Sequence, residues 1–397
     1  MIPVKKALSI IEKRTKPLGM ESVPLNESVG RVLAEDIVAD QDLPPFDRSQ
    51  MDGYAVKAAD TANVPVTLKL VGESAAGRGW TGRLRKGEAV RIMTGAPVPA
   101  GADAVQKLEV ANESDGYLLL SEPTEKGRFI VKRAAEVKKG SIVLSKGERI
   151  TSNSLAIPAA FGYSTVKVTK MPRIAIFSTG SEIVEIHKKP KADQIRNSNC
   201  VMLGSLTREV GGDVNIWPIV GDNISDLRSQ ITLAATSADV LIMTGGVSVG
   251  KYDLTKAALR ELGAEFYFDR VRLKPGKPTV FARLGKTIVF GLPGNPVSAA
   301  VTFHLFVRKC VLLMQSANVC DLSSGYAVLD DPVKGTKERD SYLPAIIATN
   351  PSGHLIASPI RWHGSSDLVG FSRADALIFV PKDVSCAAGD RVEVRFL

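Results

Sequence analysis

The chain has 397 residues, which is too many for one compact core and predicts two to four domains. Apolar residues make up 44% of it and charged residues 23%, as in an ordinary soluble globular protein. The net charge is +9, but no run of five or more basic residues occurs. The charge therefore favours a small anionic ligand over nucleic acid or an anionic membrane.

The cysteine pattern and the first residues indicate a cytoplasmic protein. The four cysteines lie far apart and no Cys/His pair has zinc-finger spacing, so reduced thiols are expected. The N-terminal segment mixes charges into a helical apolar pattern and lacks the apolar core of a signal peptide. No stretch is expected to approach the ~20 apolar residues of a transmembrane helix.

The first half of the chain predicts mainly short strands. Residues 3–17 have the pattern of an amphipathic helix, and residues 30–40 that of a helix giving way to a short strand. A proline-rich loop follows at 42–56. Between 64 and 128, short segments rich in β-branched residues alternate with turn signals, which is typical of a small β domain.

The second half predicts a different architecture. Residues 137–150 continue in strands, and 151–163 predict a helix. From Pro172 to Cys320, apolar strands alternate with helical patterns of about 10–15 residues, which indicates a parallel sheet with helices on both faces. Short strands separated by Gly, Pro and Asp turns then run to the end, typical of a small barrel or sandwich.

Three predicted strand ends in the α/β region carry small, polar or glycine residues. They are Ser178-Thr179-Gly180-Ser181-Glu182, Thr244-Gly245-Gly246-Val247-Ser248 and Gly291-Leu292-Pro293-Gly294-Asn295-Pro296. Ligands bind at the carboxyl ends of parallel strands, and glycine lets a phosphate approach the backbone. Each loop alone could equally serve close backbone packing. Neither a P-loop nor a Rossmann glycine fingerprint occurs.

Three carboxylates follow strands of the same sheet. Glu182, Asp222 and Asp253 would repel one another unless a cation lay among them, so this edge favours a divalent metal such as Mg²⁺. Asp253 could instead be only the N-cap of its helix.

Lys274 and Lys277 flank Pro-Gly, and the stiff segment would aim both ammonium groups at a small oxyanion rather than leave them solvated. Asp52 precedes glycine and could be either a turn residue or a site carboxylate. The turn around Ser365 could grip an anion or be an ordinary surface loop. No histidine has the context of a Ser-His-Asp triad.

The order of these motifs is specific. "GRVLAEDI", "DLPPFDRSQMDGYAV", "RIMTGAPVPAGADAV", "STGSEI", "TGGVSVGKYD", "LKPGKP", "GLPGNPVSA" and "GSSDLVGFSRADAL" occur in this order. Together they resemble the molybdopterin molybdenumtransferase family, which includes the C-terminal domain of gephyrin. The resemblance covers nearly the whole chain.

The resemblance implies a multidomain α/β plus β fold. It divides the chain into an extended linking domain (1–40 and 130–170), an inserted β-rich domain (41–129), a doubly wound, mostly parallel α/β molybdopterin-binding domain (171–320) and a C-terminal β-barrel (321–397). It also implies a homodimer with the active site at the interface, and contacts with a molybdopterin adenylyltransferase and apo-molybdoenzymes.

The implied reaction inserts molybdenum from molybdate into adenylyl-molybdopterin, with Mg²⁺-dependent hydrolysis and AMP release. The resemblance implies catalytic roles for Asp52, Glu182, Asp222, Asp253, Lys274 and Lys277, of which the four carboxylates would hold the metal. It implies binding of the molybdopterin substrate and molybdate by Thr179, Gly180, Ser181, Thr244, Gly245, Gly246, Ser248, Pro275, Gly276, Pro293, Gly294, Asn295, Pro296, Ser298, Arg339 and Ser365.

The chain departs from the family pattern at several positions. Ser181 stands where the family usually has aspartate; the other departures are at Ala134, Pro344, His363 and Ser366. Two alternatives remain open: a non-catalytic molybdopterin-binding scaffold, and a molybdopterin adenylyltransferase.

Overall fold

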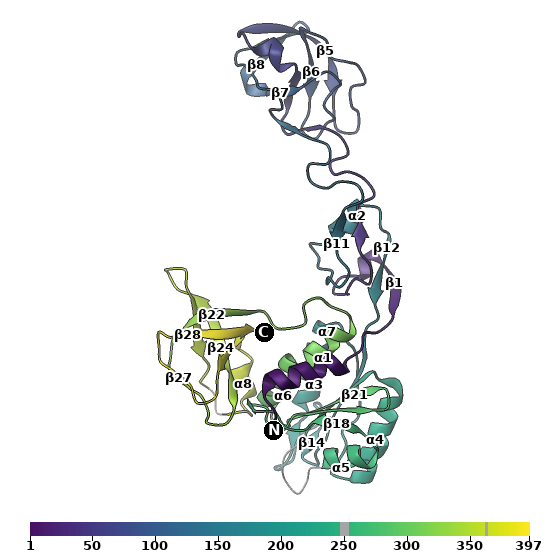
Figure 1. Cartoon of the computed structure of the whole chain (residues 1–397), viewed down its shortest axis with the longest axis vertical. Coiled ribbons are helices and arrows are strands. Elements are labelled where there is room, and N and C mark those ends of the chain that lie inside the picture. The colour runs from purple at the N-terminus through teal and green to yellow at the C-terminus, as the bar shows by residue number, and fades with distance from the viewer. Residues whose placement is uncertain (247–253, 362–363) are drawn as a thin grey trace. The chain divides into compact units, whose positions relative to one another are not determined.

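The computed structural model describes residues 1–246, 254–361 and 364–397 (Figure 1). The chain forms two compact units. The first consists of Met1–Glu35, Lys146–Leu155 and Thr165–Leu397, and the second of Asp36–Ser145 and Ala156–Ser164. The second unit is thus built from segments inserted into the first.

The second unit contains the predicted β-rich region. Its six-stranded sheet has the order β7-β4-β6-β5-β9-β8. The strands are β4 (Gly53–Val56), β5 (Val66–Ser74), β6 (Glu88–Ile92), β7 (Ala104–Lys107), β8 (Ala111–Ser114) and β9 (Tyr117–Leu120). Tyr54 and Val56 pack into one core and Ala55 into another, because successive side chains of a strand point to opposite faces. Both faces of β4 are therefore buried.

Short strand pairs and one helix complete this unit. β2 (Ile37–Val38) pairs with β11 (Ile142–Leu144), and β3 (Arg48–Ser49) with β10 (Ile130–Val131). The helix predicted at 151–163 is only the short α2 (Ala156–Ala160).

The helix predicted at the start of residues 30–40 is wrong. Val32 and Leu33 are consecutive and both buried, and each forms a single antiparallel bridge, to Arg149 and Val168 respectively. In an extended segment, successive side chains point in opposite directions, so pairing on both sides buries both of them. In a helix, the residues that share a buried face are three or four positions apart. β1 (Met20–Pro24) pairs with β12 (Thr165–Thr169) beside them.

The α/β region of the first unit confirms the predicted doubly wound sheet. Its order is β16-β13-β17-β21-β20-β18, and the pairs β13–β16, β13–β17 and β17–β21 are parallel. The strands are β13 (Arg173–Ser178), β16 (Asp213–Ile216), β17 (Val240–Thr244), β18 (Glu265–Phe268), β20 (Val280–Leu284) and β21 (Thr287–Leu292). Since β16 and β17 lie on opposite sides of β13, the strand order reverses between β13 and β17.

Helices cover both faces of this sheet (Figure 1). Ile174 and Ile176 of β13 point into one core, and Ala175 and Phe177 into the other. The first core is closed by α1 (Val4–Arg14), α3 (Ser198–Glu209), α6 (Pro296–Thr302) and α7 (Arg308–Met314), and the second by α4 (Ile224–Ser237) and α5 (Leu254–Glu261). Strands buried on both faces explain the continuous apolar runs in the sequence.

The long helical run after β21 is more apolar than the sequence predicted. α6 continues through a π-helical segment (Phe303–Val307) into α7, and Pro296–Met314 has the length and hydropathy of a membrane span. However, 83% of its most apolar window is buried inside the protein. It has the burial expected of a core helix.

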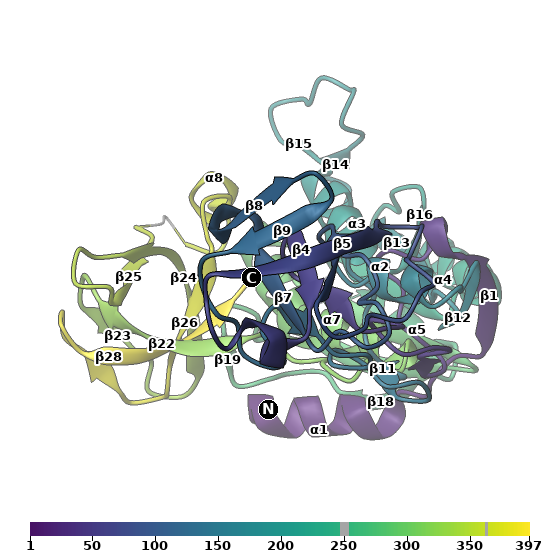
Figure 2. The ribbon, with the colours of Figure 1, turned by 90° about the horizontal axis from the view of Figure 1, so that it is seen from above.

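The C-terminal strands close into a barrel, as predicted (Figure 2). Its strands are β22 (Ser324–Leu329), β24 (Asp340–Thr349), β25 (Leu355–Pro359), β26 (Ala376–Val380) and β28 (Arg391–Phe396). The order β24-β25-β22-β28-β26 is completed by an additional β24–β26 pairing, which removes the sheet edges. β23 (Val333–Lys334) pairs with β27 (Ser385–Cys386), and the short helix α8 is Leu368–Phe371.

Two further short elements matter for the site. β14 (Ile183–Val184) pairs with β15 (Ile195–Arg196) just after β13. β19 (Leu273–Lys274) runs parallel to β24 and so joins the α/β region to the barrel.

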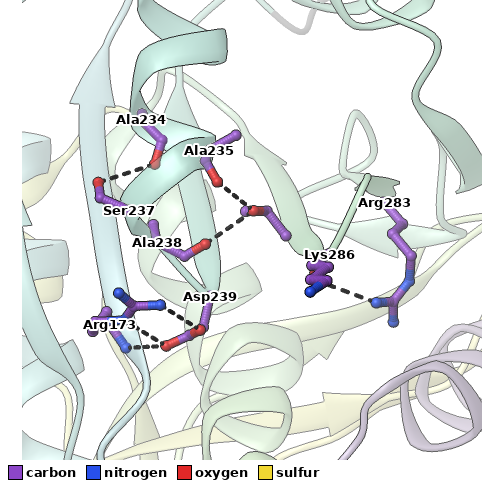
Figure 3. A network of polar contacts seen from close by, with 9 residues as sticks. Arg173, Ala234, Ala235, Ser237, Ala238, Asp239, Arg283 and Lys286 are labelled. Atoms are coloured by element: carbon purple, nitrogen blue, oxygen red, sulfur yellow. Dashed lines mark hydrogen bonds and ion pairs between the residues drawn. The ribbon is translucent and has the colours of Figure 1, made fainter.

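The amino-terminal end of the sheet is closed by internal contacts (Figure 3). The Arg173 guanidinium donates to both carboxylate oxygens of Asp239, at 3.1 and 3.2 Å, and this pairing raises the pKa of Arg173. Thr287 Oγ1 donates to the carbonyls of Ala235 and Ala238, both at 2.9 Å. The hydrogen-bonding capacity of these polar groups is used within the protein, so we interpret their role as structural.

Candidate functional site

The loops after β13 and β17 meet where the strand order reverses. The Thr179 backbone N–H donates to the Thr244 carbonyl at 2.9 Å. Gly245 and Gly246 have φ values of +95° and +61°, and a Cβ on Gly246 would lie only 2.8 Å from Thr179 Oγ1. Glycine is therefore required here both by conformation and by close approach. The predicted site residue Ser248 lies outside the described residues.

Asn199, near the start of α3, ties β17 to the loop after β21. Its Nδ2 donates to Thr244 Oγ1 at 2.9 Å and to the Gly294 carbonyl at 2.7 Å, while Thr244 Oγ1 donates to the Pro293 carbonyl at 3.0 Å. Asn199 Oδ1 and Thr179 Oγ1 are buried without a hydrogen-bond partner among the described residues. Sequence reasoning missed Asn199, although the polar run 197–199 opening a helix at the same edge was a usable signal.

Two of the predicted carboxylates lie at the turn after β13. The Ser181 backbone N–H donates to Asp222 Oδ2 at 3.1 Å, and the Asp222 N–H donates to Ser181 Oγ at 3.2 Å. The Glu182 carboxylate folds over Gly180, where a Cβ would otherwise stand. Ser181 therefore helps to fix Asp222, although the family usually has an aspartate at this position.

The described residues do not form a complete metal centre. Asp253 lies outside them. In the described part of the chain, no group of three or more His, Cys, Asp or Glu side chains could hold a metal ion.

A cavity of about 530 Å³ lies beside this edge and brings most of the predicted anion-binding residues together. Its lining contains the predicted Lys274, Pro275, Gly276, Lys277, Pro293, Asn295, Ser298, Arg339 and Ser365, together with Arg270, Pro278 and Gly364. The lining has four cationic side chains and, among the described residues, no carboxylate. Sequence reasoning missed Arg270, four residues before Lys274 in the same segment.

Tertiary contacts bring Arg339 to the lysines. Leu273 pairs with Asp340, and the Asp340 N–H donates to the Arg272 carbonyl at 3.1 Å. Arg339, which directly precedes β24, is placed by this pairing. The barrel thus completes a cavity that the α/β sheet begins.

The segment carrying the lysines is a closed loop. The Val271 N–H donates to the Lys277 carbonyl at 3.0 Å, and Thr279 Oγ1 donates to the Gly276 carbonyl at 2.7 Å. Gly276 has φ +118° and packs against Thr302 of α6. The backbone from which both lysines extend is therefore fixed, and no ion pair to a carboxylate of the described residues holds either ammonium group.

Hydroxyl groups complete the cavity wall. Ser298 on α6 is buried. Asn295 Nδ2 donates to Ser365 Oγ at 2.7 Å, and the Val297 N–H donates to the Ser365 carbonyl at 3.1 Å. Since Ser365 Oγ accepts from Asn295, its own proton remains to be donated. Pro296 is the first residue of α6, and His363 lies outside the described residues.

Asp52 belongs to the second unit, where it directly precedes β4. Its Oδ1 accepts from the Thr94 backbone N–H at 2.6 Å and from Thr94 Oγ1 at 2.9 Å. Both hydrogen bonds lower the pKa of Asp52, and the one from the backbone N–H has the larger effect. An exposed, ionised carboxylate is thus held in one orientation.

Comparison with known proteins gives matches along most of the chain. The MoeA N-terminal region (domain I and II) matches residues 2–162, the probable molybdopterin binding domain residues 175–312, and the MoeA C-terminal region (domain IV) residues 326–397. A molybdopterin molybdenumtransferase of Bacillus subtilis (strain 168) is 34% identical over 388 residues, covering 96% of this chain and 90% of the relative. That of Staphylococcus aureus (strain COL) is 32% identical over 384 residues, covering 96% and 91%.

Solved structures agree over the full length. The molybdopterin biosynthesis MoeA protein from Pyrococcus horikoshii OT3 superposes with a TM-score of 0.86 at 29% identity, covering 100% of both chains. A second Pyrococcus structure of a protein described in the same way gives a TM-score of 0.80 at 33% identity, covering 100% of this chain and 99% of the other.

Proposed function

The chain belongs to the molybdopterin molybdenumtransferase family of molybdenum cofactor biosynthesis, and within this enzyme family we propose that it inserts molybdenum from molybdate into adenylyl-molybdopterin with release of AMP. One observation supports this most: the cavity has four cationic side chains and no carboxylate among its described lining residues. A tetrahedral oxyanion needs such aimed cationic and hydroxyl donors.

The proposed reaction has two steps. In the first, water adds to a phosphorus of the phosphoanhydride, the P–O–P bond breaks, and AMP leaves. In the second, two Mo–S bonds form to the dithiolene sulfurs and one Mo–O bond breaks. The released oxygen leaves as water with two protons, and molybdenum keeps its oxidation state. Neither step needs an electron donor or acceptor.

The cavity residues would act by neutralisation and orientation. Lys274, Lys277 and Arg339 would offset the charge of molybdate, and the Ser298 and Ser365 hydroxyls would donate to its oxygens. Because the loop around Gly276 is closed, the backbone that carries Lys274 and Lys277 needs little rearrangement when the anion binds.

We assign the pterin phosphate and nucleotide to the loops after β13, β17 and β21. The support is the location at the reversal of strand order and the glycine backbone of Gly245 and Gly246. Thr179 would donate its hydroxyl, and Asn199 would present an acceptor, to a ligand there.

Mg²⁺ remains a proposal based on the donor chemistry. Glu182 and Asp222 supply the oxygen ligands that this ion prefers, but the described residues do not complete a three-ligand group. When bound, the ion would reduce the repulsion between phosphate oxygens and an attacking water. Asp253 belongs to this proposal through its place after a predicted strand of the same sheet and through the family resemblance, and Asp52 chiefly through the resemblance.

We further propose that the protein is a cytoplasmic homodimer with its active site at the dimer interface. We keep the division into a linking region (1–40 and 130–170), a β insertion (41–129), an α/β domain (171–320) and a barrel (321–397). Contacts with a molybdopterin adenylyltransferase and with apo-molybdoenzymes are part of the same proposal. The support for all of these is the resemblance over nearly the whole chain. The sequence has no run of five or more basic residues, which favours small anionic ligands over nucleic acid as partners.

One assay tests the function against its alternatives. The purified protein receives adenylyl-molybdopterin, Mg²⁺ and molybdate, and AMP release and reconstitution of an apo-molybdoenzyme are measured. We expect both to occur, and cofactor formation to require molybdate. Substrate binding without AMP release would indicate a scaffold instead. Adenylylation of molybdopterin from ATP would indicate an adenylyltransferase, although the linking region, insertion and barrel argue against that.

A further inference from the structure

The cavity carries more positive charge than one molybdate ion requires. Arg270, Lys274, Lys277 and Arg339 line it, giving a formal charge of +4. None of these four side chains forms an ion pair with a carboxylate within the described ranges of the chain. Molybdate has a charge of −2, so two positive charges remain without a counter-charge when it binds alone.

The volume of the cavity agrees with this excess. At about 530 Å³ it falls within the ~300–1,000 Å³ range of sites that hold organic ligands. A four-oxygen anion fills only part of such a space. The lining therefore has both room and charge for a second anionic group.

Arg270 is held firmly at this cavity. Ile2 donates its N–H to the Arg270 carbonyl at 3.1 Å and accepts from the Arg272 N–H at 2.8 Å. The Nε of Arg270 is buried without a hydrogen-bond partner among the residues described. A buried donor left unpaired is unfavourable, and a bound anion would offset that cost by pairing with the guanidinium.

We propose that Arg270 is a fourth anion-binding residue and that the cavity neutralises two dianions at once, molybdate and the dithiolate of the pterin. The identity of these anions rests on the proposed function. Forming two Mo–S bonds brings charges of −2 and −2 together, and their repulsion opposes the step. Four fixed cations match the combined charge of −4, so all four are needed only when both reactants are present.

Variants of the full chain test this inference. Arg270→Gln removes the charge, Arg270→Lys keeps the charge but loses the planar fork, and Arg272→Gln is the matched control two residues away, outside the cavity lining. Sodium molybdate is titrated by calorimetry, and kcat and KM for molybdate are measured in the insertion assay. Thermal melting checks that each variant is folded.

The expected pattern separates binding from turnover. Arg270→Gln should lower kcat about 100-fold, as removal of one preorganised donor does. It should change the Kd for molybdate less than about threefold, because three cations still face one dianion. Arg270→Lys should recover part of kcat, and Arg272→Gln should match the wild type.

Two results would overturn the inference. If Arg270→Gln turns over like Arg272→Gln, Arg270 does not bind a reacting anion. If Arg270→Gln weakens molybdate binding by the same factor as it lowers kcat/KM, with kcat unchanged, the cavity holds a single anion. A wild-type protein that forms no molybdate-dependent product would instead refute the proposed function. Calorimetry would then still test the single-anion alternative, in which Arg270→Gln weakens molybdate binding more than threefold.

Discussion

Gly276 lies between the two cavity lysines, and replacing it with alanine should damage the site through backbone strain. The new Cβ would lie 2.5 Å from Thr302 Cγ2 and 2.9 Å from Leu273 Cδ2, whereas carbon atoms in contact are ordinarily about 3.5–4.0 Å apart. Overpacking of this kind costs about 1–3 kcal/mol. A φ of +118° costs a residue with a Cβ a further ~1–2 kcal/mol.

The two costs together predict a loss of about 2–5 kcal/mol, which corresponds to a fall in melting temperature of about 5–15 °C. The backbone must shift by about 1 Å to relieve the clash, and a misplacement of that size costs about 100-fold in rate. We therefore expect Gly276→Ala to lower molybdate-dependent insertion about 100-fold at a temperature where it remains folded. Scanning calorimetry and the insertion assay measure the two effects.

A matched control separates the clash from the backbone conformation. Gly285 also has a positive φ, +57°, but a Cβ there would lie within 4 Å of no atom of the described residues. Gly285→Ala should cost about 1 kcal/mol and leave insertion unchanged.

A second substitution should relieve the clash. Thr302→Ser removes Cγ2 but keeps the hydroxyl that donates to the carbonyls of Ser298 and Ala299. Combined with Gly276→Ala it should restore about 1 kcal/mol, because residues in contact couple. The reasoning fails if Gly276→Ala behaves like Gly285→Ala, or if Thr302→Ser restores nothing.

Three further predictions concern charge. Asp52→Asn keeps the acceptor for Thr94 but removes the charge, so AMP release should fall about 100-fold while the melting temperature stays nearly unchanged. AMP release should stop when Mg²⁺ is chelated, and Glu182→Gln should raise the Mg²⁺ concentration for half-maximal rate about 10- to 100-fold. Burial, aided by Arg308, lowers the pKa of His304 to about 4. The neutral, buried His304 therefore contributes about 3 kcal/mol of stability above pH 6.5, and this contribution is lost as the pH falls from 6.5 towards 4. His304→Gln should flatten the denaturant-measured stability in that window.

Each of these predictions has a clear opposite outcome. Equal AMP release by Asp52→Asn and wild type would remove Asp52 from the chemistry. An unchanged Mg²⁺ requirement in Glu182→Gln would remove that carboxylate from the metal site. For the pH dependence, the exposed His354→Gln is the control, and a stability profile of His304→Gln that matches it would contradict the assignment.

The sequence predicted the layers of the α/β region because a strand buried on both faces must be apolar along its length, and such a run can be recognised locally. Apolar runs such as 240–243 must be buried on both sides, and the amphipathic helices between them must cover a sheet. The same local pattern was misleading at Val32 and Leu33. Their consecutive apolar side chains fit a helix, whereas antiparallel bridges to Arg149 and Val168 decided the outcome.

By itself, the sequence determined the loop chemistry of the site: glycines after strands, the rigid segment from Lys274 to Lys277, and the run of motifs that identifies the family. Only the tertiary structure decided which of these residues share one cavity. Arg339 joins the lysines because β24 pairs with β19, and the otherwise unremarkable Arg270 joins them because its segment is closed and held by Ile2. Pairing between segments distant in sequence leaves no periodic signal in either of them, so it can be read only from the folded chain.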